Sequence, residues 1–282
     1  MGRLTNPEGA SAPLPKPPPG NRLRRQSRRS NGGQSSTRLT VLGWQALSLG
    51  VLLLAWEAAV RLGIADQLFV PAPSAVATAL AATSGDVLPR LADTLLKTLM
   101  GYGLAVVLGV GGGLVIGSSR LLHQVAMPYV VALYGIPKIL ILPWIALIFG
   151  LGVSTAVLTG ALFAFFPIVL MVAAGTRDVD PTLITVATSM GATRRQVGLK
   201  VLLPAVLPSV LAGMRVGMVF AMLGVLLAEM FAGTRGMGFL MQRLAMAFKA
   251  SELFAATVVV SALSIAVVLF LEHLNQRLGR WR

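Results

Sequence analysis

The chain has 282 residues, of which 55% are hydrophobic and only 12% charged, and its mean hydropathy is +0.78. A soluble domain carries about 25% charged residues, so this composition excludes an ordinary soluble globular protein. The absence of cysteine excludes disulfides and thiolate chemistry. A net charge of +14 would suit a nucleic-acid-binding protein, but a third of the basic residues lie in one N-terminal segment.

Residues 1–40 form that basic segment. Eight of the 24 lysines and arginines lie there, among prolines, serines, asparagines and glycines, with no periodic apolar pattern. Such a segment buries too little apolar surface to fold, so we predict a disordered, cytoplasmic tail. A short basic tail before a membrane span typically faces anionic lipid and sets the topology, which we favour over nucleic-acid binding.

Six apolar segments follow, each long enough for a helix that crosses the ~30 Å hydrocarbon layer. They are residues 41–60, 98–119, 125–149, 152–175, 205–230 and 253–271. Only helices and closed barrels satisfy their own backbone groups in lipid. Residues 41–282 are therefore predicted to be all-α, a polytopic membrane protein with six transmembrane helices. With the N-terminus inside, the inner segments carry sixteen Lys and Arg and the outer ones six, which places both termini in the cytoplasm.

Small residues recur at every fourth position of the second span: Gly101, Ala105, Gly109, Gly113 and Gly117. They form one smooth helical face that lets another backbone approach closely. The third span is interrupted by Pro128, Pro137 and Pro143, and each proline removes a backbone donor and kinks or breaks a helix. Broken helices in membranes often line a substrate cavity, although a kink needed only for packing would leave the same pattern.

Two basic residues, Lys138 and Arg215, fall near the middle of spans. Charges at that depth are costly and usually serve a cavity or a partner. Together with Pro137 and Pro143 they are candidates for a pathway that attracts an anionic solute. Alternatively, each cation binds backbone carbonyls freed by a nearby proline, Pro137 for Lys138 and Pro208 for Arg215.

Residues 176–203, between the fourth and fifth spans, are too polar for the membrane and too long for a simple turn. Asp180 followed by Pro181 predicts a helix start, with Asp as N-cap and Pro at the first helical position. Gly191 predicts its end, because glycine readily adopts the left-handed conformation of a helix stop.

A second short helix is predicted directly after this glycine. Thr193 and Gln196 have the spacing of a capping box, and the helix should run through Lys200 until Pro204 breaks it before the fifth span. The first helix carries apolar residues at helical spacing: Leu183, Ile184, Ala187 and Met190. We expect some of these to pack on the membrane domain and the rest to form a ridge that fits a groove in a soluble partner.

The segment resembles the signature of bacterial ABC-importer permeases: Glu-Ala-Ala, three residues, Gly, nine residues, Ile-x-Leu-Pro. Here it reads Thr185-Val186-Ala187, then Gly191, then Val201-Leu202-Leu203-Pro204, with both spacings intact. AGMRVG at 212–217, AEM at 228–230 and GMGFL at 236–240 support the resemblance. PAPS at 71–74, IPKILILPW at 136–144 and FGLG at 149–152 are similar to the nitrate, taurine and alkanesulfonate branch. One position departs from the signature, because Thr185 replaces its glutamate.

The resemblance implies the fold of a type I ABC importer permease, in a bacterial inner membrane, whose 176–203 segment couples to a separate ATPase subunit. The implied coupling residues are Leu183, Ile184, Thr185, Val186, Ala187, Met190, Gly191, Ala192, Arg194, Arg195, Val201, Leu203 and Pro204. Arg194 and Arg195 would pair with acidic groups on the ATPase. The resemblance also implies an extracytoplasmic solute-binding protein, for which the loop 233–236 is a candidate contact, although a glycine-rich turn explains that loop equally well.

The sequence contains no GxxxxGK[ST] motif to hold the phosphates of ATP. We therefore expect no enzyme activity, no cofactor and no metal in this chain, with ATP hydrolysis on the separate subunit. Six helices are few to enclose a pathway, so we expect a homodimer with two-fold symmetry. An intramembrane hydrolase is disfavoured because His123 and His273 flank spans and neither Glu57 nor Glu229 has a neighbouring carboxylate.

The predicted substrate is a small anion such as nitrate, taurine or an alkanesulfonate. A permease for another small solute, such as a thiamine precursor, a phosphonate or methionine, stays open, and so does a passive channel. Co-purification of an ATPase subunit would separate an importer from a channel.

Overall fold

A computed structural model describes residue 2 and residues 33–82 and 84–278, and all regular structure in these ranges is helical. The first helices are α1 (Gly33–Arg61), α2 (Pro73–Ala82), α3 (Ser84–Ser118) and α4 (Arg120–Gly135). They are followed by η1 (Lys138–Ile141), α5 (Leu142–Phe149), α6 (Val153–Arg177), α7 (Pro181–Ser189) and α8 (Arg194–Val197). The last are η2 (Gly198–Leu202), α9 (Leu203–Ala232), α10 (Met237–Met246) and α11 (Ala250–Leu278).

The chain divides into two compact units, residues 1–55 and 56–282, with the boundary inside α1. In the first unit α1 begins at Gly33, so residues 33–40 are helical although they were predicted to belong to the tail. Residues 3–32 of the predicted basic tail lie outside the described residues.

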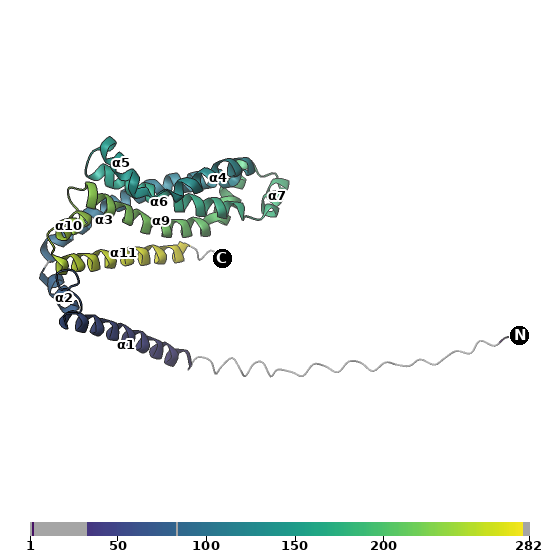
Figure 1. Cartoon of the computed structure of the whole chain (residues 1–282). Coiled ribbons are helices and arrows are strands. Elements are labelled where there is room, and N and C mark those ends of the chain that lie inside the picture. Colours follow the sequence, from purple (N-terminus) through teal and green to yellow (C-terminus); the bar gives the residue numbers. More distant parts are fainter. Residues whose placement is uncertain (1, 3–32, 83, 279–282) are drawn as a thin grey trace. The chain divides into compact units, whose positions relative to one another are not determined.

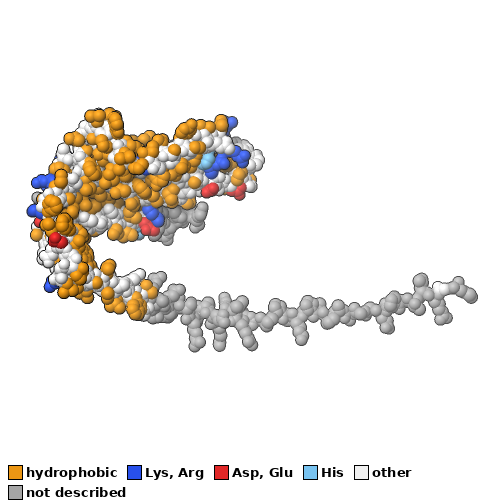
Figure 2. All heavy atoms as spheres, viewed as in Figure 1, with side chains coloured by type: hydrophobic (Ala, Val, Ile, Leu, Met, Phe, Trp, Pro, Cys, Tyr) orange, Lys and Arg blue, Asp and Glu red, His pale blue; other side chains and the backbone are white. Residues whose placement is uncertain are grey.

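The predicted all-α membrane fold is confirmed. Five helices among the described residues are long and apolar enough to cross a membrane: Thr40–Arg61, Val87–Ser118, Val153–Arg177, Arg194–Ala232 and Ala250–His273. The third predicted span, residues 125–149, corresponds to a pair of helices, Arg120–Gly135 and Lys138–Phe149, which are bent by 85° relative to each other. Hydrophobic side chains cover the flanks of the bundle, and most charged side chains visible in Figure 2 lie at its two ends.

Helices α3, α6 and α9 form the core of the bundle, with Ile168 and Val172 of α6 fully buried. The predicted glycine face of α3 packs on α6. A Cβ atom at Gly117 would lie 2.5 Å from the Cβ of Thr176, and one at Gly101 would lie 2.6 Å from the carbonyl oxygen of Val157. Since real Cβ atoms do not approach so closely, only glycine permits this helix spacing.

The break in the third span lies at Pro137, one of its three prolines. Pro128 lies inside α4 without ending it, and Pro143 occupies the first turn of α5, where its missing N–H costs nothing. Ile136 has extended backbone angles, as is typical of a residue before proline. The expectation that each proline interrupts the span is therefore wrong for Pro128 and Pro143.

The two ends of the bundle differ. Helix α7 lies at one end, whereas α10 and α2 lie at the opposite end, beside the start of α11 (Figure 1). We call these the α7 end and the α10 end.

Candidate coupling segment and ion-pair network

Helix α7 is capped at both ends by its own sequence. Asp180 accepts a hydrogen bond from the backbone N–H of Thr182 at 2.8 Å, and Pro181 fills the first helical position. Hydrogen bonds from the side chain and backbone of Thr182 hold the pKa of Asp180 below its usual value. The predicted N-cap is confirmed.

Gly191 ends α7 with a φ of +80°. Its N–H donates to the Thr188 carbonyl at 3.0 Å, and the N–H of Ala192 donates to the Ala187 carbonyl at 3.1 Å. This pair of bonds is the Schellman motif, which satisfies carbonyls at a helix end and requires a left-handed residue between them. The predicted glycine stop is confirmed, and it fixes the direction in which the chain leaves α7.

Helix α8 begins with the predicted capping box. The N–H of Thr193 donates to Gln196 Oε1 at 2.8 Å, and the N–H of Gln196 donates to Thr193 Oγ1 at 3.4 Å. Only the start of this helix was predicted correctly, because α8 is regular for four residues and then continues as the π-helix η2 into α9.

Pro204 therefore does not end the helix before the fifth span, contrary to the prediction. In a regular α-helix the proline ring would clash with the carbonyl of Lys200. The wider π-helical turn, closed by the Leu203 N–H on the Gly198 carbonyl, relieves that crowding. As a result, residues 194–232 form one continuous helical rod.

The apolar residues of α7 are exposed. None of its residues is buried, and Leu183, Val186 and Met190 are exposed by 50%, 52% and 83%. The helix contacts α8 and η2, and Ala187 of its ridge is half-buried, whereas the larger apolar side chains of the ridge are left uncovered. A contiguous apolar patch of this kind on a polar segment is typical of a protein-binding site.

The other predicted coupling positions differ in their surroundings. Thr185, which replaces the signature glutamate, donates its hydroxyl to the Pro181 carbonyl of its own helix at 3.1 Å. Arg194 and Arg195 are exposed and have no ion pair within the described part of the chain. Arg195 lines a groove with Leu199, Leu202 and Leu203 at the α7 end, while Val201 is half-buried.

Lys138 and Arg215 lie in different surroundings and have different partners. Lys138 Nζ donates to the Tyr134 carbonyl at 2.9 Å and lies 4.4 Å from the centroid of the Tyr134 ring. The Phe166 ring is 5.3 Å away. Arg215 on α9 forms an ion pair of 3.5 Å with Glu272 of α11. Each cation therefore has a partner within the chain. For Lys138 this partner is a carbonyl just before Pro137, as expected if Lys138 binds a backbone group near that proline.

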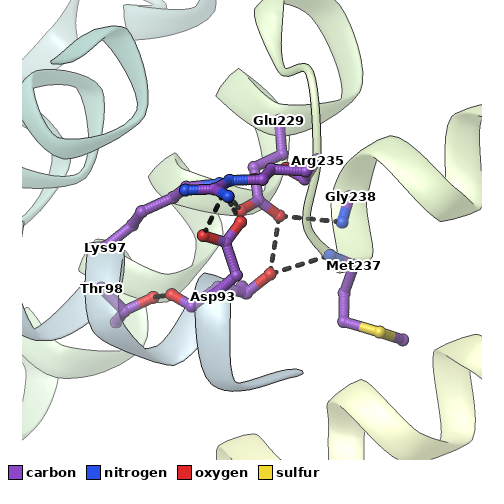
Figure 3. A network of polar contacts seen from close by, with 8 residues as sticks. Asp93, Lys97, Thr98, Glu229, Arg235, Met237 and Gly238 are labelled. Carbon is purple, nitrogen blue, oxygen red and sulfur yellow. Dashed lines mark hydrogen bonds and ion pairs between the residues drawn. The ribbon is translucent and has the colours of Figure 1, made fainter. Parts of the chain in front are cut away.

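A buried network at the α10 end was not predicted. Glu229 of α9 is fully buried and lies between Lys97 of α3 and the start of α10 (Figure 3). Its carboxylate accepts hydrogen bonds from Lys97 Nζ at 2.8 Å, Thr94 Oγ1 at 2.8 Å and the Gly238 N–H at 3.0 Å. Lys97 is one of the six basic residues counted in the predicted outer segments, and its side chain is only 3% exposed.

The loop before α10 closes on this carboxylate. Gly236 has a φ of +112°, and a Cβ there would lie 2.1 Å from a carboxylate oxygen of Glu229. The N–H of Met237 donates to Thr94 at 2.8 Å, and Lys97 also donates to the carbonyl of Arg235 at 3.0 Å. The AEM and GMGFL motifs thus meet in space. A charged residue inside a span needs a partner. The position of Glu229 within the fifth span was therefore the one signal in the sequence that indicated an ion pair here.

A sequence profile described as the binding-protein-dependent transport system inner membrane component matches residues 105–280, more than half of the chain. The chain belongs to this family. It is a permease subunit of an ABC importer, the non-catalytic membrane component of such systems.

Known permeases are similar over most of their length. The taurine transport system permease protein TauC of Escherichia coli is 29% identical over 238 residues, covering 82% of this chain and 84% of TauC. The riboflavin transport system permease protein RibX of Chloroflexus aurantiacus is 31% identical over 244 residues, covering 84% and 91%. An inward-facing structure of the MetNI methionine ABC transporter has a TM-score of 0.60 at 21% identity, covering 69% of this chain and 95% of that one.

This permease therefore has the type I ABC importer fold, as the resemblance implied. Permeases of the family reside in the inner membrane and work with ATPase subunits and a solute-binding protein. The relatives differ in the solute named for them, so membership in the family does not by itself specify a substrate.

Proposed function

We propose that this permease imports a small anion, such as nitrate, taurine or an alkanesulfonate, and that the α7–α8 segment couples it to a separate ATPase. The observation that carries the proposal is the exposed apolar ridge on a helix capped at both ends. A short helix that is held rigid but left uncovered is suited to a groove of a partner protein.

The docking energy is moderate. Burying Leu183, Ile184 and Met190 against a partner contributes about 1.5–3 kcal/mol for each side chain, before the cost of association. Arg194 and Arg195 add charges that acidic groups of the partner could neutralise. Thr185 has no carboxylate, and its hydroxyl donates a hydrogen bond within its own helix. On this proposal the interface therefore depends on the apolar ridge and the two arginines.

The continuous rod from Arg194 to Ala232 supplies the mechanical link. A movement of the ATPase groove that displaces α7 and α8 would be passed through η2 to α9 without an intervening flexible loop. Val201, Leu203 and Pro204 belong to this junction rather than to the docking ridge.

The orientation and assembly are parts of the same proposal. The excess of Lys and Arg in the segments next to the α7 end favours a cytoplasmic location for that end and for both termini. The α10 end would then face the extracytoplasmic binding protein, with the loop 233–236 as a contact. We propose a homodimer, each copy with its own ATPase, because six spans enclose little space.

An anionic substrate is supported by the similarity to TauC and by the cation Lys138 at the break in the third span. We propose that Lys138, with Pro137 and Pro143 around it, and Arg215 line the pathway. A second candidate is a larger neutral or heterocyclic solute, which the similarity to the riboflavin permease RibX favours.

Co-purification and uptake test this function. The permease is co-expressed with the ATPase and binding protein encoded beside it, then reconstituted in proteoliposomes. Met190→Asp, on the ridge, should abolish co-purification of the ATPase and ATP-driven uptake, because a charge cannot be buried in an apolar groove. Ser189→Asp adds the same charge to the opposite face of α7 and should leave both intact. Unchanged coupling in Met190→Asp would refute the docking role, and a ligand screen of the binding protein separates anions from riboflavin.

A further inference from the structure

A second cluster of charges lies at the α10 end, outside the parts of the chain assigned to coupling. It surrounds a pocket of about 320 Å³ lined by Pro89, Arg90, Asp93, Arg235 and Gly236. Its lining residues belong to α3 and to the loop that precedes α10, and two of them, Asp93 and Arg235, also contact Lys97 of the buried network.

The charges around this pocket do not balance. Asp93 Oδ2 accepts from Lys97 at 2.5 Å, and Asp93 Oδ1 lies 3.4 Å from Arg235 Nε. Lys97 also pairs with Glu229 at 2.8 Å. These are two carboxylates against two cations, so they cancel. Arg90 is the third cation and has no ion pair within residues 56–278 as described. One positive charge therefore remains at the pocket.

The scaffold beside the Arg235 guanidinium group is anchored, because both carboxylate oxygens of Asp93 are engaged, one by Lys97 and the other by Arg235. Asp93 therefore positions Arg235, and these two cations partly offset its negative charge. Gly236 lines the pocket with a backbone that admits no side chain, because a Cβ there would collide with Glu229. The wall of the pocket is thus tied to buried groups, while Arg90 is half-buried and Arg235 is exposed.

We propose that this pocket binds a small oxyanion, a sulfonate or sulfate group, between Arg90 and Arg235. A guanidinium group presents parallel N–H donors that match two oxygens of such a group, whereas a spherical anion such as chloride uses this geometry poorly. On the proposed function, on which this inference rests, the α10 end faces the binding protein. The pocket would then receive the solute at the entrance and raise its local concentration.

The test uses the full-length permease in lipid nanodiscs. Sodium sulfate and sodium methanesulfonate are titrated by isothermal calorimetry, with sodium chloride at matched ionic strength as the reference. We expect saturable binding of both oxyanions. Arg90→Gln and Arg235→Gln should each weaken it roughly tenfold to a hundredfold, the loss of a hydrogen bond to a charged group. Arg243→Gln is the matched control, because Arg243 lies on α10 over the Phe239 ring and does not line the pocket.

A charge change of the opposite sign gives an independent arm. Asp93→Asn removes one negative charge from the cluster and should tighten oxyanion binding, provided that size-exclusion and thermal unfolding profiles show a folded protein. Should this variant not fold, the two arginine variants and their control decide alone. Binding in Arg90→Gln within twofold of wild type, or an equal loss in Arg243→Gln, overturns the proposal.

The same variants distinguish a free oxyanion from a carboxylate of the binding protein as the group that the two arginines bind. If free oxyanions do not bind but Arg90→Gln weakens docking of the binding protein, the arginines serve a carboxylate of that partner and the proposal is wrong. If the ATPase co-purifies and ATP-driven uptake is observed, but no oxyanion binds, the oxyanion-binding role of the pocket is refuted and the proposed function is retained. If oxyanions bind but no ATPase co-purifies, the proposed function is refuted and the oxyanion-binding role of the pocket is retained.

Discussion

Lys97→Met tests the buried network most directly. The substitution keeps an unbranched apolar chain of similar length but leaves Glu229, which is 0% exposed, without its cation. Removing one partner of a buried ion pair costs about 3–5 kcal/mol because the other charge stays buried. Glu229 keeps its hydrogen bonds from Thr94 and Gly238, so we expect a loss in the free energy of unfolding near the lower end, about 3 kcal/mol.

The assay is the free energy of unfolding in bicelles, measured by steric trapping, with thermal midpoints in detergent as a second readout. Lys97→Met/Glu229→Gln removes both charges and should recover about 2 kcal/mol of the loss, within the range of coupling energies between residues in contact. Lys249→Met is the matched control, since the Lys249–Glu252 pair of 3.6 Å is solvent-exposed and should contribute about 0–1 kcal/mol. A double variant no more stable than Lys97→Met, or equal losses in Lys97→Met and Lys249→Met, would refute the reasoning.

Three further predictions concern other parts of the chain. Gly191→Ala should cost about 1–2 kcal/mol in local stability, because Gly191 has a φ of +80°, and it should lower the uptake per ATP hydrolysed. Gly198→Ala is the control and should change neither quantity, because Gly198 is at a helical position with open space around it. Gly117→Val should reduce the thermal midpoint, because a Cβ there would lie 2.5 Å from an α6 side chain, whereas Gly111→Val meets no atom within 4 Å. Because the pKa of Asp180 is lowered, its cap stabilises α7 fully at a pH above the usual carboxyl pKa, and this stabilisation is lost as the pH falls through the lowered pKa. Hydrogen exchange of the α7 amides should therefore accelerate in that acid range. Asp180→Asn should abolish this acceleration.

Local features of the fold were predictable because each depends on residues close together in the sequence. The N-cap at Asp180, the stop at Gly191 and the capping box at Thr193 all involve spacings of five residues or fewer and needed no tertiary contact. The spans were predictable because the lipid imposes a length and a composition. The glycine face of α3 was recognisable as a packing surface, although its partner, α6, was not.

Features that depend on distant residues were not predictable from one sequence. Three prolines in the third span gave three possible breaks, and the sequence pattern did not distinguish Pro137, where the span bends, from Pro128 and Pro143. The Lys97–Glu229 pair spans 132 positions. Counting basic residues by segment used Lys97 only as evidence for topology, and this count gave no sign that Lys97 pairs with Glu229.

The network and the coupling segment lie at opposite ends of the same helix. Helix α9 has thirty residues, about 45 Å at 1.5 Å per residue. It joins η2 near the α7 end, and its Glu229 is held to α3 near the α10 end. An ion pair of 2.8 Å resists translation far more than rotation about the contact. On the proposed function, a pull on α7 would therefore tilt α9 about Glu229 instead of sliding it along its axis, so Lys97→Met should leave ATP hydrolysis intact while uptake per ATP falls. Equal uptake per ATP in Lys97→Met and in wild type would mean that the pivot lies elsewhere.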